Sequence, residues 1–270
     1  MNLTEIRQRL DEERRTVALD SEVIDELPTV ARLRARSGSY HLVISSNLAA
    51  DNADAAIAHE IDHHRRMGVE FEWKLFTHDQ PPNLLDRLKA HGFEPGPIEA
   101  VLVLDMTNPP SWVSETDTSN VVRIQNPEQV MTDYRQVEVA VFGEGNGSNA
   151  RELADAVRNH SSQHRGYIAY SAGQPVSIGR LYTHPNSQFG GLYGGGTIPT
   201  HRSRGFYRAL IAARAKDALH SGARYLLVDA LPTSRPILER LGFQHLTDTI
   251  PFHWQPANDP STLRDPNSEL

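Results

Sequence analysis

The segment from Thr197 to Arg208 joins a glycine-rich strand to the most helix-like part of the chain, residues 206–219. The first amides of a helix have no intrahelical acceptors, and Gly205, just before the helix, permits close backbone approach. Together they form an anion site. Three guanidinium groups suited to bidentate phosphate contacts surround it: Arg202, Arg204 and Arg208. We therefore predict that this turn binds the pyrophosphate of a coenzyme.

Composition narrows the class of protein. The chain has 270 residues, and its 27 basic and 34 acidic side chains give a net charge of −7. Nucleic acid needs a net basic face, so it is not expected as a partner. The chain contains no cysteine, which excludes disulfides, thiolate zinc ligands and a thiol nucleophile. The charged N-terminal segment and the lack of a long apolar run predict a cytoplasmic protein that does not bind a membrane.

Apolar periodicity and turn residues predict an α/β chain in which strands and helices alternate. Residues 1–38 have helical spacing and high charge, so we expect them to be helical. Strands are predicted at 40–45, 69–76, 100–106, 121–124, 167–170, 176–182, 190–197, 224–231 and 250–254. Further helices are predicted at 51–67, 82–91, 127–142, 151–161, 206–219 and 234–241.

The two halves repeat one order of elements, in which a strand, a helix, a strand, a short helix ending in Gly-Phe and a strand follow one another. The closing dipeptides are Gly92-Phe93 and Gly242-Phe243. We interpret this as a degenerate internal duplication, although two unrelated α/β halves would share part of the order. The predicted organisation is an N-terminal domain (1–106), a Pro/Ser/Thr-rich linker (107–118), a C-terminal domain (119–256) and a disordered tail (257–270).

The motif at 197–210 resembles the coenzyme A signature of the GNAT N-acetyltransferase superfamily, in which a strand end and an Arg-x-x-Gly turn lead into a helix. Arg202 and Gly205 match that turn. The second landmark of that superfamily, a short helix ending in Leu-Gly-Phe, is matched by 236–243. The resemblance implies a mixed, mostly antiparallel central sheet flanked by helices, complete in the second half and a partial copy in the first.

The same resemblance implies an N-acetyltransferase that moves acetyl directly from acetyl-CoA to an amine, expected to be a small molecule, with no metal. Ile198 would donate its amide to the thioester carbonyl. The residues implied in coenzyme binding are Thr197, Ile198, Arg202, Ser203, Arg204, Gly205, Phe206, Tyr207 and Arg208. A solvated helix start remains the alternative for the arginines.

The chain departs from the family pattern at two positions. Tyr207 stands where a small residue is usual, and Leu238 stands where many members carry a tyrosine that protonates the leaving thiolate. If an acid is needed, Ser234, Tyr193 or water must supply the proton. Candidates for the base that deprotonates the amine are Asp229, which we prefer for its place at a strand end, and His184, His201 and Glu144.

Two other functions stay open. His59-Glu60-Ile61-Asp62-His63 matches the zinc-peptidase helix motif, but helical geometry sets both imidazoles opposite the apolar stripe, which favours a solvated face. Because Leu238 stands in place of the tyrosine that would act as the acid, a non-catalytic acyl-CoA-binding or regulatory module is the second alternative. In the first half, the turn at 46–51 has neither cation nor glycine. We expect that half to bind no coenzyme and to pack on the C-terminal domain.

Overall fold

The computed structural model describes residues 2–144 and 147–256 of the chain, so the predicted tail at 257–270 lies outside the described residues. The helices are α1 Leu3–Thr16, α2 Ala53–Met67, α3 Leu84–Ala90, α4 Trp112–Glu115, α5 Pro127–Gln129, α6 Arg135–Phe142, α7 Gly147–Arg158, α8 Phe206–His220 and α9 Arg235–Arg240, with a π-helical turn η1 Val130–Tyr134 and a 3-10 turn η3 Pro199–His201. The strands are β1 Glu22–Glu26, β2 Val30–Ala35, β3 His41–Ser46, β4 Phe71–Phe76, β5 Glu94–Pro95, β6 Glu99–Asp105, β7 Val121–Arg123, β8 His164–Ser171, β9 Gln174–Thr183, β10 Phe189–Thr197, β11 Tyr225–Ala230 and β12 Gln244–Trp254.

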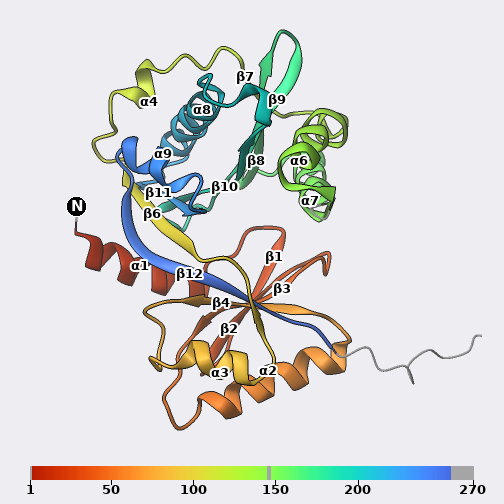
Figure 1. Cartoon of the computed structure of the whole chain (residues 1–270), viewed down its shortest axis with the longest axis vertical. Coiled ribbons are helices and arrows are strands. Elements are labelled where there is room, and N and C mark those ends of the chain that lie inside the picture. The colour runs from red at the N-terminus through yellow and green to blue at the C-terminus, as the bar shows by residue number, and fades with distance from the viewer. Residues whose placement is uncertain (1, 145–146, 257–270) are drawn as a thin grey trace, which may run out of the picture.

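All twelve strands belong to one sheet with the order β1-β2-β3-β4-β12-β6-β11-β10-β9-β8-β7, and β5 pairs with the outer end of β12. The last strand of the chain, β12, lies between β4 and β6, which both come from the first half. In turn β6 pairs with β11 of the second half. Figure 1 shows β12 and β6 running side by side from the upper group of elements into the lower one. The two halves therefore share hydrogen-bonded strands at their junction.

The duplication seen in the sequence recurs in the topology. Strands β1-β2-β3 form an antiparallel meander, α2 follows, and β4 returns parallel to β3. Strands β8-β9-β10, helix α8 and the parallel strand β11 repeat this arrangement. Each parallel pair is short: two residue pairs join β3 to β4, and three join β10 to β11. Beyond those pairs the strands separate, which opens the sheet in both halves.

Apolar side chains alternate between the two faces of the central strands. Leu102 and Leu226 point into a core formed with α8 and α9. Their neighbours Val101 and Leu227 point the opposite way, into a core formed with α1. Separate apolar clusters lie beneath α2 and α3 in the first half and beneath α6 and α7 in the second. The centre of the sheet, where the halves meet, is thus covered on both faces.

The prediction that residues 1–38 are helical is correct only for α1. Residues 22–35 form the hairpin β1–β2, closed by a hydrogen bond from Leu27 N to Val30 O (2.9 Å). Its apolar residues are spaced close to a helical period, which explains the error. Pro28 suits a turn and disfavours a helix interior, and charges pair across the strands, as with Asp25 opposite Arg32.

The stretch interpreted as a linker contains the short helix α4. Trp112 is 8% exposed, and its indole Nε1–H donates to the carbonyl of Leu241 at 2.9 Å. With Val113 it joins the core under α8. Composition missed this element because two apolar residues among prolines and serines create no periodic pattern.

Candidate functional site

The site is built where β10 and β11 separate. Their pairing ends at Gly191 and Leu227. On the other side of β10, the register against β9 shifts between Tyr193 and Gly196, so that Gly194 and Gly195 have no partner in the ladder. Such a bulge takes backbone groups out of the ladder and bends the strand. A cavity of about 530 Å³ lies against this opening.

Packing explains why the bulge consists of glycines. A Cβ on Gly196 would lie 2.5 Å from Val141 Cγ1 of α6. A Cβ on Gly195 would lie 3.2 Å from the Tyr207 ring and 3.3 Å from Arg214 Nη2, on the α8 side. Helices therefore close on this strand from both faces, and any larger residue would push one of them away.

The start of α8 has the features expected of an anion site. Gly205 has φ +88°, and the position of its missing Cβ is open, so a ligand can approach the backbone. The amides of residues 203–208 donate to no acceptor in the described chain. The side chains of Arg202, Arg204 and Arg208 are exposed beside them. The turn thus offers free N–H groups and cations in one place.

The other predicted coenzyme residues have contacts that bear on their roles. Arg202 Nε donates back to Thr197 O at 3.2 Å, and Thr197 Oγ1 is hydrogen-bonded to Ser177 Oγ at 2.7 Å. Ile198 N donates to Val176 O at 3.0 Å, so the amide expected to stabilise an oxyanion is already used within the sheet. The Tyr207 ring lies close to Gly195, where an added Cβ would be 3.2 Å from its Cε2 atom.

The three predicted catalytic residues, Tyr193, Asp229 and Ser234, all line the 530 Å³ cavity, together with Leu238. Asp229 is not a free carboxylate, because its Oδ2 forms a 2.5 Å ion pair with Lys74 Nζ from β4. Burial, and then the charge of Asp229, raises the pKa of Tyr193 to about 12, so its hydroxyl keeps its proton near neutral pH.

The remaining base candidates do not reach this cavity. His184 lines an adjoining cavity, the ring of His201 bonds Thr200, and Glu144 pairs with Arg135 on the surface. The structure instead brings in Glu99 and Glu72 from the first half. Burial, with Asp229 next, raises the pKa of Glu99 to about 7. No sequence signal identified Glu99, because its place depends on β6 crossing into the second half.

Asp229, Glu72 and Glu99 form an acidic cluster in the cavity wall, and Lys74 lies among them. Burial, the largest single effect, would lower the pKa of Lys74, but the surrounding acidic groups, Asp229 first and then Tyr193 and Glu72, together outweigh it and raise the pKa above its usual value. Burial raises the pKa of Glu72, which the charge of Lys74 partly offsets. The cluster therefore combines one cation with the carboxyl groups of Asp229, Glu72 and Glu99, and Glu99, whose pKa is about 7, can exchange a proton near neutral pH.

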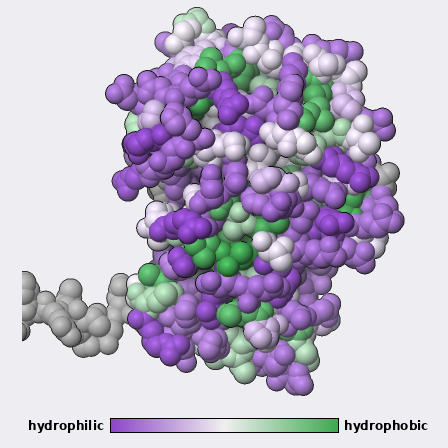
Figure 2. All heavy atoms as spheres, turned by 180° about the vertical axis from the view of Figure 1, so that it is seen from behind, coloured by the Kyte–Doolittle hydropathy of each residue, from purple (hydrophilic) through white to green (hydrophobic). Residues whose placement is uncertain are grey.

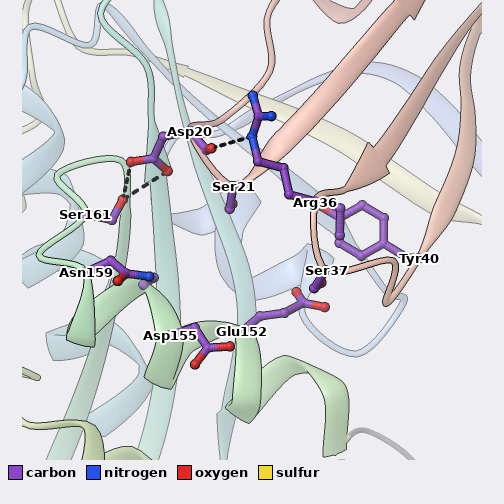
Figure 3. Close-up of a pocket in the computed structure, with 11 residues that line it drawn as sticks. Asp20, Ser21, Arg36, Ser37, Tyr40, Glu152, Asp155, Asn159 and Ser161 are labelled. Carbon is purple, nitrogen blue, oxygen red and sulfur yellow. Dashed lines mark hydrogen bonds between the residues drawn. The ribbon is translucent and has the colours of Figure 1, made fainter.

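A second cavity, of about 540 Å³, adjoins the first, and Lys74, Arg180 and Tyr193 line both. The first half supplies residues of α1, β1 and β3 to its wall. Contacts beside Tyr40 link the halves there: Ser161 Oγ donates to Asp20 Oδ2 at 3.0 Å, and Ser39 Oγ donates to Glu152 Oε1 at 2.6 Å. Figure 3 shows Asp20 facing Ser161 and Glu152 reaching toward Tyr40 across a further hollow between the halves.

The zinc-type motif on α2 does not form a ligand set. Glu60 is 1% exposed and makes a bidentate ion pair with Arg32, at 2.7 and 2.8 Å. His59 is exposed. His64, rather than either motif histidine, stacks on Phe71 in the core. Within residues 2–144 and 147–256, no group of three potential ligands that could hold a metal ion is found. The expected solvated face was wrong for Glu60, which is buried and structural.

No protein-family model matches the sequence, and no curated relative does. Solved structures match over nearly the whole chain. A functionally unknown conserved protein from Staphylococcus epidermidis has a TM-score of 0.61 at 14% identity, covering 88% of this chain and 96% of its own. A GCN5-related N-acetyltransferase from Kribbella flavida has a TM-score of 0.60 at 15% identity, and the match covers 93% of each chain. A tandem GNAT protein from the clavulanic acid biosynthesis pathway has a TM-score of 0.60 at 14% identity, and the match covers 90% of this chain and 86% of that one. The chain thus has the tandem GNAT fold, which confirms the predicted fold class.

On the face seen in Figure 2, apolar residues form small patches separated by hydrophilic ones. None of the helices in the described ranges combines the length and apolarity needed to cross a bilayer.

Proposed function

We propose that the protein transfers acetyl from acetyl-CoA to a small-molecule amine. The observation that carries this proposal is the separation of β10 and β11 beside the free amides of α8. Tyr207, in the first turn of α8, also lines the 530 Å³ cavity, whose wall combines apolar and ionisable side chains.

The residues at the opening suit coenzyme A. The amides of 203–208 and the three exposed arginines of the turn would hold the pyrophosphate. The apolar side chains of Leu192, Val228 and Leu238 line the cavity and would accept the pantetheine arm. When bound, the coenzyme supplies an activated thioester. The corresponding turn of the first half lacks free amides at Asn52 and Ala53, which both donate to Ala49 O, and this supports a single coenzyme site.

The acidic cluster would carry out the proton transfer that the reaction needs. An amine acceptor arrives as an ammonium ion and must lose a proton before it attacks. A general base works best when its pKa lies near the operating pH, which is met by Glu99 at about 7. Asp229, neutralised by Lys74, would position the ammonium rather than remove its proton. Tyr193 retains its hydroxyl proton and is the preferred donor to the leaving thiolate.

The first half has a role in this proposal although it would bind no coenzyme. It contributes Glu99, Lys74 and much of the wall of the 540 Å³ cavity. We assign that cavity to the acceptor, because it adjoins the acidic cluster on the side where the first half packs.

A calorimetric titration with acetyl-CoA tests the proposal, followed by a screen of amines in which release of free coenzyme A thiol is measured. Saturable binding and amine-dependent thiol release are expected. Gly205→Glu should abolish binding because it places a carboxylate among the phosphate-binding amides, whereas Gly173→Glu, in an open turn with similar φ (+79°), should not. No binding by the wild type would refute the coenzyme site. Binding without turnover across a broad panel would instead indicate an acyl-CoA-binding module.

A further inference from the structure

One wall of the 540 Å³ cavity is a face of the first-half sheet, and its residues follow the strand register. Glu72 of β4 pairs with Leu42 of β3, and Leu42 pairs with Leu33 of β2. Leu33 pairs with Ile24 of β1, and Glu22 lies two residues from Ile24 on the same face. All of these residues except Ile24 line the cavity. The wall thus has a carboxylate at each end and two leucines between them.

A further carboxylate lies at the β1 end of the cavity. Glu22 accepts a hydrogen bond from Tyr40 Oη, and Glu152 of α7 accepts one from Ser39 Oγ at 2.6 Å. Figure 3 shows Glu152 reaching toward Tyr40. The glutamates that form ion pairs in the described ranges do not include Glu22, Glu72 or Glu152. Because a carboxylate has about four lone-pair sites, both groups at the β1 end can still accept from a cation.

The basic side chains in the cavity wall do not neutralise these carboxylates. Arg14 is paired with Asp79, and Lys74 is paired with Asp229. Arg180 is only 8% exposed; its Nη1 donates to two neutral side chains, and its Nε is buried. Carboxylates that line a partly enclosed cavity focus their field within it and attract cations. The cavity is therefore suited to a ligand with more than one positive charge.

We propose that the acceptor is a linear polyamine, whose primary amine reacts at the acidic cluster and whose far ammonium binds Glu22 and Glu152. This inference rests on the proposed function for the transfer step. Neighbouring strands are about 4.8 Å apart, so the three spacings from β4 to β1 amount to roughly 14 Å. Carboxylates reach inward from both ends, and an extended chain advances about 3.6 Å for every three bonds. Nitrogens separated by roughly eight to eleven bonds therefore reach both ends.

The middle of the cavity suits the methylene segments of such a molecule. Leu33 and Leu42 line one side, and the rings of Tyr182 and Tyr193, with centroids 5.0 Å apart, also line it. Aromatic faces accept methylene groups and attract an intermediate ammonium. The hollow of Figure 3, of about 420 Å³, shares part of the wall at the Glu152 end, which leaves room for a longer chain.

The reaction takes place at one end of the polyamine only. Transfer forms the amide C–N bond at the reacting nitrogen and breaks the thioester C–S bond. It releases the coenzyme A thiol and one proton from the ammonium. The far ammonium takes no part in these steps, so its carboxylates should affect binding of the acceptor rather than the chemical step.

Matched ligand pairs test the inference. The probes are α,ω-diamines of four, eight and ten carbons and the corresponding amino alcohols, in which a hydroxyl replaces the far ammonium. Binding is measured by calorimetry on the full chain, with and without coenzyme A, and turnover by thiol release. The wild type should favour the two longer diamines over their amino alcohols by roughly 10- to 100-fold, the range for hydrogen bonds to a charged group. The four-carbon diamine is too short and should show little preference.

Two variants remove the far site in different ways. Glu22→Gln/Glu152→Gln should erase the preference by raising KM for the longer diamines, while the amino alcohols stay within about threefold. Because Glu22 also accepts from Leu19 N, this variant could fold poorly. Glu152→Lys leaves Glu22 unchanged, puts a cation at the same end, and should weaken the longer diamines further. Glu70→Gln, an exposed glutamate outside both cavities, is the matched control and should keep the preference.

Equal binding of longer diamines and amino alcohols by the wild type, or no saturable binding of any diamine, would overturn the inference. A fall in kcat with KM unchanged in Glu22→Gln/Glu152→Gln would also overturn it, because these residues would then act on the reaction rather than on the far ammonium. Coenzyme A binding is measured separately. Its absence in the wild type would refute the proposed function, while the diamine preference, measured without coenzyme A, would still report on the cavity.

Discussion

Lys74 of β4 and Asp229 of β11 form an ion pair of 2.5 Å across the junction of the two halves. Two strands, β12 and β6, lie between theirs in the sheet. Their side chains are 17% and 9% exposed, so the pair is largely shielded from water. It ties the first half to the proposed catalytic cavity, where Glu72 and Glu99 would otherwise add to the negative charge of Asp229.

Lys74→Met should lower the free energy of unfolding by roughly 2–3 kcal/mol, because it leaves Asp229 buried and unpaired among other carboxylates. Urea denaturation monitored by fluorescence provides the measurement. The double variant Lys74→Met/Asp229→Asn removes both charges and should recover much of the loss. A double variant as unstable as the sum of the two single ones would show that the pair contributes no coupling.

The rate of acetyl transfer at low acceptor concentration should rise with pH through a limb near 7, as Glu99 loses its proton. Glu99→Gln should remove this limb and reduce the rate by about 100-fold or more. Lys74→Met should move the limb to higher pH, because the charge of Lys74 lowers the pKa of Glu99. An unchanged pH profile in Glu99→Gln would exclude this residue as the base.

Glu99 should also leave a signature in stability. Its folded pKa lies above the value of an unfolded glutamate, so the folded state binds more protons between about pH 4.5 and 7. The contribution of this group to stability is therefore fully present below pH 4.5 and lost as pH rises through 7. Thermal denaturation at pH 8 should find Glu99→Gln at least as stable as the wild type. Marked destabilisation would indicate a structural role instead.

Charge reversal at Arg204 and Arg208 should weaken acetyl-CoA binding by roughly 10- to 100-fold, since two cations beside the free amides of α8 become anions. Calorimetry at two salt concentrations measures this effect, which should shrink at high salt. Arg240→Glu, at the exposed end of α9, serves as the matched control and should bind as the wild type does. Equal affinity in all three proteins would argue against a pyrophosphate at this turn.

Glu60→Gln should destabilise the protein by roughly 3 kcal/mol, because it leaves Arg32 with a weakened partner in a buried bidentate pair. His59→Ala, which changes an exposed residue of the same motif, should stay within about 0.5 kcal/mol. Adding zinc should leave the melting temperature of either variant unchanged. A zinc-dependent rise that disappears in His59→Ala would revive the metal hypothesis for α2.

The sequence predicted most helices and strands correctly, because residues close together in the chain decide where each of these elements forms and ends. The helix α2 ends at Gly68 in the left-handed conformation with φ +67°, as the apolar period and the glycine indicated. The failures arose where tertiary contacts decide. Residues 22–35 became strands because β2 pairs with β3, and Trp112 became buried because Leu241 offers it an acceptor.

The sequence by itself predicted an anion site at the turn 197–208, and it determined the order of elements that the chain shares with the GNAT fold and the repetition of that order in the two halves. These rest on glycines, helix starts and periodicity, which act over a few residues. Only the tertiary structure decided which side chains meet Asp229. The exchange of β6 and β12 brings Lys74 and Glu99 beside it. Such encounters depend on strand pairing between residues more than a hundred positions apart, and no local pattern encodes that pairing.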